Sequence, residues 1–460
     1  MIVEQIYTGC LSHGAYYIES SGEAAIIDPL REVNEYIDKA TANNSKIKFV
    51  FETHFHADFV SGHLTLSKAT GAPIVFGPNA NPNYKSIIAT DNQVFKIGDC
   101  SITAIHTPGH TMESTTYLLK DNKGKDHAIF TGDTLFLGDV GRPDLSQKSD
   151  DLTMEDLAGM QYESLRKKIL PLADDVIVYP AHGAGSACGK NMMKETVDTL
   201  GNQKKMNYAL RADMSKEEFI KEVTYGLSAP PDYFPLNVKM NKEGYEDVNL
   251  IINNGDNPID VSEFEEVVNQ SGALILDVRN QEDFSRGHIP RSIFIGLDGS
   301  FAPWVGTLIK DVEQSIALVV DKGREKEAIK RLSRVGFDKT IGYLKGGFDA
   351  WKKSSRDYDS INSISANEFE KKIKDDSLII DVRKSSEHNS KKIISSINAP
   401  LDDLNRYLKK LPNNQNFYIH CERGYRSMIA SSILKSRGIH NLIDVRGGFQ
   451  SIMKTNISLT

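Results

Sequence analysis

The segment Thr53-His54-Phe55-His56-Ala57-Asp58-Phe59 decides the fold of the first half of the chain, because two histidines and an aspartate follow the apolar run of residues 48–51. Three further motifs follow strand-like runs in the same way: Thr107-Pro108-Gly109-His110, Thr131-Gly132-Asp133 and Pro180-Ala181-His182-Gly183. Polar residues at the ends of such strands can converge at one edge of a sheet. Imidazoles and carboxylates are ligands for a borderline divalent metal, so the four motifs together predict a metal centre. A lone histidine is more often a core or surface residue, and we assign no role to His13, His63, His106 and His127.

The four motifs resemble the metallo-β-lactamase superfamily, whose metal motif is H-x-H-x-D-H followed by later histidine, aspartate and histidine positions. Residues 1–245 are then expected to form an αββα sandwich with a C-terminal arm. Phe59 stands in place of the last histidine of the motif, and a phenyl ring cannot coordinate a metal. The pattern therefore favours a mononuclear centre and is similar to the persulfide dioxygenase branch. The resemblance implies the metal ligands His54, His110 and Asp133, with His56, Asp58 and His182 around the metal or facing the substrate.

Two histidines and one carboxylate leave about three coordination positions open, as in non-haem Fe(II) oxygenases. The resemblance to the persulfide dioxygenase branch therefore implies one mononuclear Fe(II) per chain, where a persulfide sulfur and O2 can be held side by side. Zinc with a bound water at the same ligands would instead make a hydrolase of the glyoxalase II type. Residue types alone do not decide between iron and zinc.

Four more residues are candidates for the substrate side of this centre. Arg142 either pairs with a carboxylate of a thiol carrier or fixes its own loop through an ion pair. Cys188 either borders the substrate channel or is a buried, inert thiol. Tyr233 and Phe234, in the Pro-rich segment 229–235, are expected to form a lid or an interdomain prop.

The second half of the chain repeats itself. The runs that begin at Leu274, Ser315 and Lys345 are matched by runs 104, 100 and 101 residues later. Each unit of about 100 residues alternates strands with helices, which predicts a small parallel sheet covered on both faces. We expect one unit at 246–356 and one at 357–460, each an α/β domain.

The last unit contains Cys421-Glu422-Arg423-Gly424-Tyr425-Arg426-Ser427 between a strand-like run and a helical pattern. Loop amides, a helix N-terminus, Arg423 and Arg426 all favour the nucleophilic thiolate of Cys421. With Asp-Val-Arg upstream and Gly-Gly-Phe downstream, this unit resembles a rhodanese sulfurtransferase domain. The resemblance implies that Cys421 carries sulfane sulfur and that Arg423, Gly424 and Arg426 bind the substrate. A departure is that the Gly-His-Ile-Pro stretch of such domains reads Lys391-Lys392-Ile393-Ile394 here.

The middle unit also resembles a rhodanese, and it keeps Gly287-His288-Ile289-Pro290. However, Asp321 occupies the cysteine position, and a carboxylate cannot accept sulfane sulfur. We therefore expect an inactive domain that is structural or serves in docking.

The composition argues against a nucleic-acid-binding protein, a membrane-spanning protein and a disulfide-bonded secreted protein. The 460 residues carry 55 Lys and Arg against 62 Asp and Glu, so no basic field indicates nucleic-acid binding. No apolar run approaches the roughly 18 residues of a membrane span, and the start resembles no signal peptide. Four scattered cysteines are too few for a disulfide framework, which favours a cytoplasmic protein.

As a whole, the chain resembles the bacterial persulfide dioxygenase–rhodanese fusion proteins of the CstB type. The resemblance implies oxidation of a low-molecular-weight thiol persulfide by O2 to sulfite, followed by thiosulfate formation at Cys421, in sulfide detoxification. Coenzyme A, bacillithiol and glutathione persulfides all fit, and we expect a homo-oligomer. A different class remains open, in which Cys421 is a sulfur carrier or sensor and the metal domain is vestigial.

Overall fold

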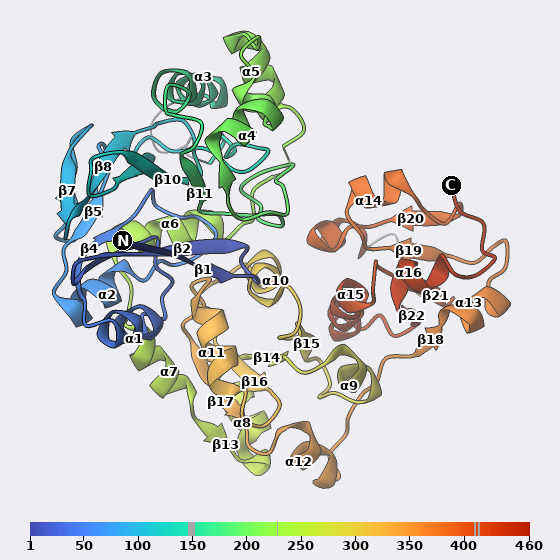
Figure 1. Ribbon diagram of the computed structural model, residues 1–460. Coiled ribbons are helices and arrows are strands. Elements are labelled where there is room, and N and C mark those ends of the chain that lie inside the picture. Colours follow the sequence, from blue (N-terminus) through green and yellow to red (C-terminus); the bar gives the residue numbers. More distant parts are fainter. Residues whose placement is uncertain (146–151, 228, 409–410, 413–414) are drawn as a thin grey trace. The chain divides into compact units, whose positions relative to one another are not determined.

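The computed structural model describes residues 1–145, 152–227, 229–408, 411–412 and 415–460. The chain forms two compact units (Figure 1). The first contains Met1–Val248 with Ser333–Gly336, and the second contains Asn249–Leu332 with Phe337–Thr460. Among the described helices, none is long and apolar enough to cross a membrane.

The first unit contains two six-stranded sheets that lie face to face (Figure 1). The first sheet has the order β1-β2-β3-β4-β5-β6, with β1 Ile2–Thr8, β2 His13–Ser20, β3 Glu23–Ile27, β4 Lys46–Phe51, β5 Ile74–Phe76 and β6 Ile87–Ile88. The second has the order β12-β11-β10-β9-β8-β7, with β7 Val94–Ile97, β8 Cys100–His106, β9 Thr115–Lys120, β10 Asp126–Gly132, β11 Ile177–Pro180 and β12 Asp198–Thr199.

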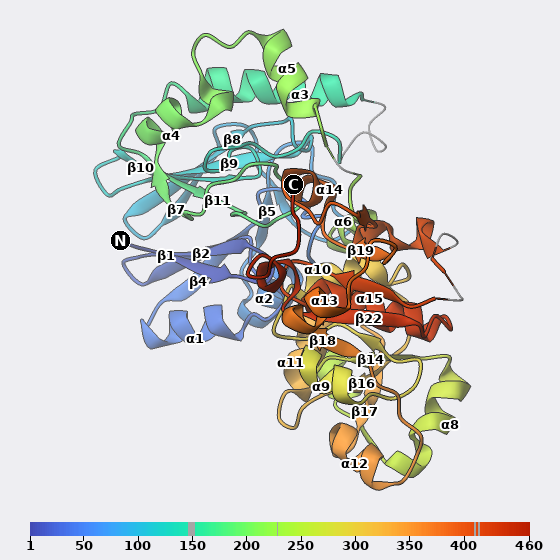
Figure 2. The ribbon, with the colours of Figure 1, turned by 90° about the vertical axis from the view of Figure 1, so that its right-hand side faces the viewer.

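Helices cover the outer faces of both sheets, as both ribbon views show (Figures 1 and 2). The first sheet is covered by α1 (Asn34–Ala42) and α2 (His63–Thr70). The second is covered by α3 (Met154–Ser164) with its π-helical continuation (Leu165–Ile169), α4 (Leu200–Met206), a short 3-10 turn (Tyr208–Leu210) and α5 (Lys216–Thr224). This is the predicted αββα sandwich.

Alternation along the strands divides the apolar side chains between three core layers. On β2, Tyr17 packs with Tyr36 of α1 on the outer face, while Tyr16 and Ile18 face the second sheet. The outer layer of the second sheet includes Leu200 and Phe219. Residues 200–224 thus complete the helical layer of the sandwich, because their apolar faces pack on the sheet.

The remaining part of the first unit holds α6 (Phe234–Glu243) and the start of α7 (Val248–Gly255). Pro235 stands at the first turn of α6, where a missing N–H group costs little. Helix α6 packs near the loop that follows β4, since Asn241 bonds to that loop. The predicted arm therefore reaches the candidate metal centre.

The second unit contains two five-stranded sheets in which every described pairing is parallel. Their orders correspond, β13-β17-β16-β14-β15 and β18-β22-β21-β19-β20. The first comprises β13 Pro258–Ile259, β14 Leu274–Asp277, β15 Ile293–Phe294, β16 Ile316–Val319 and β17 Thr340–Leu344, with α8 Val261–Ser271, α9 Gln281–Arg286, α10 Phe301–Leu308, α11 Glu325–Ser333 and α12 Gly347–Lys353. The second comprises β18 Ser363–Ser365, β19 Ile379–Asp381, β20 Ser396–Asn398, β21 Phe417–His420 and β22 Leu442–Arg446, with α13 Ala366–Lys372, α14 Ser385–Ser390, a 3-10 turn Leu401–Arg406, α15 Tyr425–Ser436 and α16 Gly448–Ile452. The sequence repeat is therefore a repeat of topology.

Candidate functional site

The three predicted metal ligands meet in the buried interior of the first unit. His54 follows β4 of the first sheet, whereas His110 follows β8 and Asp133 follows β10 of the second. The site thus lies across the edges of two sheets, not at the edge of one. Asp133 Oδ2 lies 3.8 Å from His54 Nε2 and 3.5 Å from His110 Nε2. Both separations are below the roughly 4.2 Å that two bonds of about 2.1 Å can span, so each pair of atoms can contact one ion.

The surroundings of the trio leave these three atoms available to a metal. His110 donates a hydrogen bond through Nδ1–H to Arg142 O, 2.8 Å away, and this tautomer leaves Nε2 unprotonated. His54 Nδ1 lies 3.0 Å from Thr53 Oγ1. Within the described part of the chain, Asp133 Oδ2 has no hydrogen-bond partner although it is buried. A buried carboxylate oxygen without a partner is costly, so the donor set fits a cation.

Electrostatics hold His54 and Asp133 in the protonation states that metal binding requires. Burial, followed by the neighbouring His56, lowers the pKa of His54 well below its usual value. Burial by itself would raise the pKa of Asp133, but His182, His54 and His110 hold that pKa well below its usual value. The imidazole of His54 is therefore neutral and the carboxylate of Asp133 ionised at neutral pH.

The second predicted group, His56, Asp58 and His182, lies beside the first. Its ligand atoms also lie within 4.8 Å of one another. His182 bridges the two groups, with Nδ1 2.8 Å from Asp133 Oδ1 and Nε2 3.0 Å from Asp58 Oδ2. Phe59 is fully buried, and its ring centroid lies 4.4 Å from that of His56. The phenyl ring therefore occupies space beside this group without supplying a ligand.

Several buried polar residues that the sequence analysis missed support the loop after β4. Asp28, at the end of β3, accepts hydrogen bonds from Thr53 N (2.7 Å) and Thr53 Oγ1 (2.9 Å). From α6, Asn241 donates to His56 O and Phe59 O and accepts from Ser61 N, at 2.8, 2.9 and 2.8 Å. The strand-end position of Asp28 could have identified it, whereas no local signal marks Asn241.

Two histidines to which no role was assigned are buried around the same site. The His13 ring lies 5.6 Å from His56 and 5.4 Å from His182, between ring centroids. Burial, followed by the charges of His182 and His56, lowers the pKa of His13 to about 3. His63 Nδ1 lies 3.2 Å from Glu52 Oε1, and its Nε2 lies 2.6 Å from Tyr84 Oη. By contrast, His106 bonds to Met112 O on the other side of its loop.

The predicted substrate-side residues have different partners. Arg142 forms a bidentate ion pair with Asp144, with Nε–Oδ1 and Nη2–Oδ2 distances of 2.6 and 2.7 Å. Cys188 is buried, and its Sγ lies within 4.8 Å of ligand atoms of Asp133 and His182. Burial, with the charges of Asp58 and Asp133, raises the pKa of the Cys188 thiol well above its usual value. Tyr233 is buried as well, at the start of α6.

Cys421 lies in the second unit, in the loop between β21 and α15. Its side chain is buried, and Sγ accepts a hydrogen bond of 3.1 Å from the amide of Gly424. Gly424 precedes the first turn of α15 with φ 101°, a left-handed conformation that favours glycine. The sulfur therefore faces a loop amide at a helix N-terminus, as the sequence predicted.

The arginines of this loop are not equivalent. Arg423 is exposed, whereas Arg426 binds both oxygens of Glu387, at 2.6 and 2.8 Å. Arg383, a buried arginine to which the sequence assigned no role, stacks on Phe449 at 3.8 Å from the ring centroid and lies 3.2 Å from Glu422 Oε2. In the middle sheet the equivalent loop begins with Asp321, which is exposed.

Comparisons with known proteins match the two halves of the chain separately. Residues 8–182 match the metallo-beta-lactamase superfamily, and residues 260–354 and 365–455 each match the rhodanese-like domain. A probable hydroxyacylglutathione hydrolase of Schizosaccharomyces pombe is 31% identical over 38% of this chain and 66% of its own length. The cytoplasmic hydroxyacylglutathione hydrolase of Arabidopsis thaliana is 32% identical over 38% of this chain and 65% of its own length. The chain thus spans just under two thirds of these curated relatives.

One solved structure extends the likeness beyond the metal-binding part. A crystal structure of a metallo-beta-lactamase from Staphylococcus aureus subsp. aureus COL is 30% identical, with a TM-score of 0.66. The match covers 75% of this chain and 98% of that chain.

Proposed function

We propose that this chain, which consists of a metallo-β-lactamase superfamily domain followed by two rhodanese-like domains, is a persulfide dioxygenase and sulfurtransferase. The first domain would oxidise a low-molecular-weight thiol persulfide, and the last would convert the sulfite to thiosulfate. In the first reaction, one persulfide, one O2 and one water give one thiol, one sulfite and two protons.

The observation that carries the first activity is the combination of His54, His110 and Asp133 with a phenyl ring at position 59. The trio places two imidazole nitrogens and one carboxylate oxygen within 4.8 Å of one another. This ligand set suits non-haem Fe(II), which when bound would supply adjacent open positions for O2 and a sulfur ligand. Phe59 deprives the neighbouring group of a ligand, which favours one metal per chain over two.

The chain's own residues would prepare this centre for a persulfide. The backbone carbonyl of Arg142 orients His110, and Thr53 contacts His54. Cys188 and Tyr233 are buried close by, and they would exclude water from the reacting sulfur. The ion pair with Asp144 fixes Arg142 in its loop, so its predicted contact with a carboxylate of the thiol carrier would require that pair to open.

The second activity would take place at Cys421. Its thiolate would attack the outer sulfur of a thiol persulfide, which breaks the S–S bond, releases the thiol and leaves the sulfur on Cys421. Sulfite would then take that sulfur to give thiosulfate and restore the thiolate. The amide of Gly424 would stabilise negative charge on the sulfur in both steps.

Two sites on one chain that share sulfite raise its effective concentration for the second site. Together the two reactions would convert reduced sulfur to thiosulfate. We propose that this serves sulfide detoxification, as the resemblance to the CstB-type fusion proteins implies. Coenzyme A, bacillithiol and glutathione persulfides remain the candidate substrates.

A second candidate is a zinc-dependent thioester hydrolase fused to a sulfur-carrying rhodanese. The names of the curated relatives, hydroxyacylglutathione hydrolases at 31% and 32% identity, favour it. The two candidates differ in metal, in O2 consumption and in substrate, so one set of measurements distinguishes them.

The test measures metal content and persulfide-dependent O2 uptake of the purified chain. We expect one iron per chain and O2 uptake with glutathione or coenzyme A persulfide. Asp133→Ala should lose the iron and the O2 uptake, while His440→Ala, which alters an exposed histidine of the last domain, should retain both. Stoichiometric zinc with thioester hydrolysis and no O2 uptake would establish the hydrolase instead. Two irons per chain would contradict the mononuclear centre.

A further inference from the structure

Helix α15, which begins at the Cys421 loop, packs along one side against the middle rhodanese-like domain. The residues at this contact recur with helical spacing: Tyr425, Met428, Ser432 and Lys435. Ser432 Oγ accepts a hydrogen bond of 3.0 Å from Phe294 N on β15, which satisfies an N–H group of this edge strand. Lys435 Nζ lies 2.6 Å from Asp359 Oδ1 in the segment that connects the two sheets.

Tyr425, the first residue of α15, makes the most specific of these contacts. Its hydroxyl donates a hydrogen bond of 2.7 Å to Gly296 O, and its ring lies 5.9 Å from the Phe294 ring. A Cβ atom added at Gly299 would lie 2.3 Å from Tyr425 Cζ, so the ring fills the space that this glycine leaves. The Tyr425 side chain therefore packs against three residues of the middle domain, Phe294, Gly296 and Gly299.

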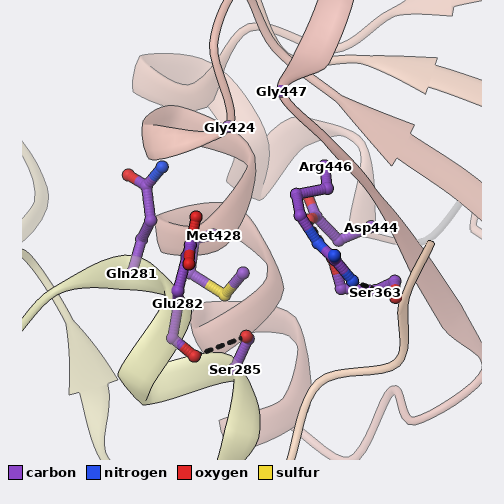
Figure 3. A pocket seen from close by; sticks show the side chains of 9 residues that line it. All are labelled: Gln281, Glu282, Ser285, Ser363, Gly424, Met428, Asp444, Arg446 and Gly447. Carbon is purple, nitrogen blue, oxygen red and sulfur yellow. Dashed lines mark hydrogen bonds between the residues drawn. The ribbon is translucent and has the colours of Figure 1, made fainter. Parts of the chain in front are cut away.

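The residue before Tyr425 is the one that contacts the reactive sulfur. Gly424 donates its amide to Cys421 Sγ, and a peptide bond joins it to the residue seated in the middle domain. On its other side Gly424 faces α9, because a Cβ atom there would lie 3.5 Å from Gln281 Nε2. Figure 3 shows Gln281 and Glu282 of α9 beside a small cleft that is also lined by Gly424, which precedes α15, and by Met428 of α15.

We propose that the middle domain, which has no cysteine of its own at the active position, positions the Cys421 loop through Tyr425. Tyr425 is a positioning residue, because it touches the neighbouring domain and acts on the sulfur through the amide of Gly424. The proposal rests on the proposed sulfur transfer at Cys421. It assigns a role in that reaction to a domain that carries none of the chemistry.

The test follows the reactivity of Cys421 in the full-length protein. Iodoacetamide modification of the Cys421 peptide is measured by mass spectrometry as a function of pH, in wild type, Gly299→Ala, Tyr425→Phe and Tyr425→Ala. Loss of a hydrogen bond to a charged group should slow modification near neutral pH about tenfold in Gly299→Ala and Tyr425→Ala, and shift the profile to higher pH. Tyr425→Phe keeps the ring and should retain most of the reactivity.

Ser300→Ala is the matched control, since Ser300 is the exposed neighbour of Gly299 and its side chain caps no helix. It should leave the profile unchanged. A folded Gly299→Ala protein with the wild-type profile would overturn the proposal, and so would equal profiles for Tyr425→Phe and Tyr425→Ala. If Gly299→Ala does not fold, the comparison of Tyr425→Phe with Tyr425→Ala tests the proposal by itself. Modification needs no persulfide, so a wild-type chain that forms no thiosulfate would refute the proposed function without affecting this comparison.

Discussion

Phe59 shows how much chemistry a single side chain can decide in a shared fold. It is buried between the rings of His13 and His56, at 4.3 and 4.4 Å between centroids. An imidazole at this position would add a nitrogen ligand beside Asp58 and His182, whereas phenyl adds only apolar volume. The difference between one metal and two, and between oxygenase and hydrolase chemistry in our proposal, depends on this residue.

At the same scale, Cys421 separates the two proposed activities. Cys421→Ser should abolish thiosulfate formation, because a hydroxyl cannot carry sulfane sulfur, while persulfide-dependent O2 uptake continues and sulfite accumulates. Oxygen electrode traces and sulfite and thiosulfate assays on the same samples provide the measurement. Cys10→Ser serves as the control and should leave both activities intact. Loss of O2 uptake in Cys421→Ser would contradict independent sites.

Asp444 gives a prediction on stability. Burial raises the pKa of this carboxyl to about 6, although Ser427 and Ser363 donate hydrogen bonds to it at 2.7 and 2.9 Å. The folded state therefore binds the proton more tightly than the unfolded state, whose pKa is near 4. The stability associated with that proton is present at low pH and is lost as the pH rises through about 6, a difference on the order of 3 kcal/mol.

Asp444→Asn keeps an acceptor for Ser427 and carries no charge. Its free energy of unfolding relative to wild type should therefore increase between about pH 4 and about pH 7. Urea unfolding at several pH values measures this, with the exposed Asp376→Asn as the control. A difference that does not depend on pH would refute the assignment.

At the scale of elements, a buried arginine makes the same contacts in both parallel-sheet domains of the second unit, although the segment whose carbonyl it binds differs in sequence. In the middle domain Arg279 binds Asp277 and donates to Gly287 O at 2.9 Å. In the last domain Arg383 binds Asp381 and donates to Lys391 O at 2.7 Å. A carbonyl acceptor requires no particular side chain, and the φ of Gly287 is 177°, which any residue adopts. The arginine therefore keeps its backbone acceptor in the last domain, where Lys391-Lys392 stands in place of Gly-His.

Helix α6 gives the second element-scale prediction. Asn241→Ala leaves His56 O, Phe59 O and Ser61 N without their side-chain partner. We expect the free energy of unfolding to fall by about 3 kcal/mol and iron affinity to fall at least about tenfold, because the loop that holds His54 loses its support. Urea unfolding and competition with a chelator measure the two effects.

The exposed Lys239→Ala on the same helix is the control for Asn241→Ala. It should match wild type in both measurements. Unchanged iron affinity in Asn241→Ala would show that α6 does not support the metal loop.

At the scale of the whole molecule, the two candidate sites belong to different compact units, so removal of the metal should affect one and spare the other. After chelation and desalting, persulfide-dependent O2 uptake should stop. Thiosulfate formation from added sulfite and glutathione persulfide should continue at the wild-type rate, and Fe(II) should restore O2 uptake. Loss of both activities on chelation would contradict this independence.

The sequence by itself indicated the candidate metal ligands and the candidate cysteine, and it determined the order of a metallo-β-lactamase domain and two rhodanese-like domains. Metal-ligand types at strand ends, a cysteine between a strand and a helix, and a repeat of about 100 residues are local patterns, and local patterns can be read from one chain. It also indicated the αββα sandwich through the resemblance that those motifs carry.

Only the tertiary structure decided which distant residues complete the sites. Asn241 lies 185 residues beyond the carbonyl of His56 that it binds, and Tyr425 lies 129 residues beyond its acceptor Gly296. For Arg142 the sequence left a substrate contact and a loop-fixing ion pair both open, and the fold places Asp144 within reach of its guanidinium group. Arg426 was expected to bind the substrate, but Glu387 lies within reach of it. The physical reason is that a hydrogen bond depends on distance and direction in space, which sequence spacing does not specify once chain segments pack together.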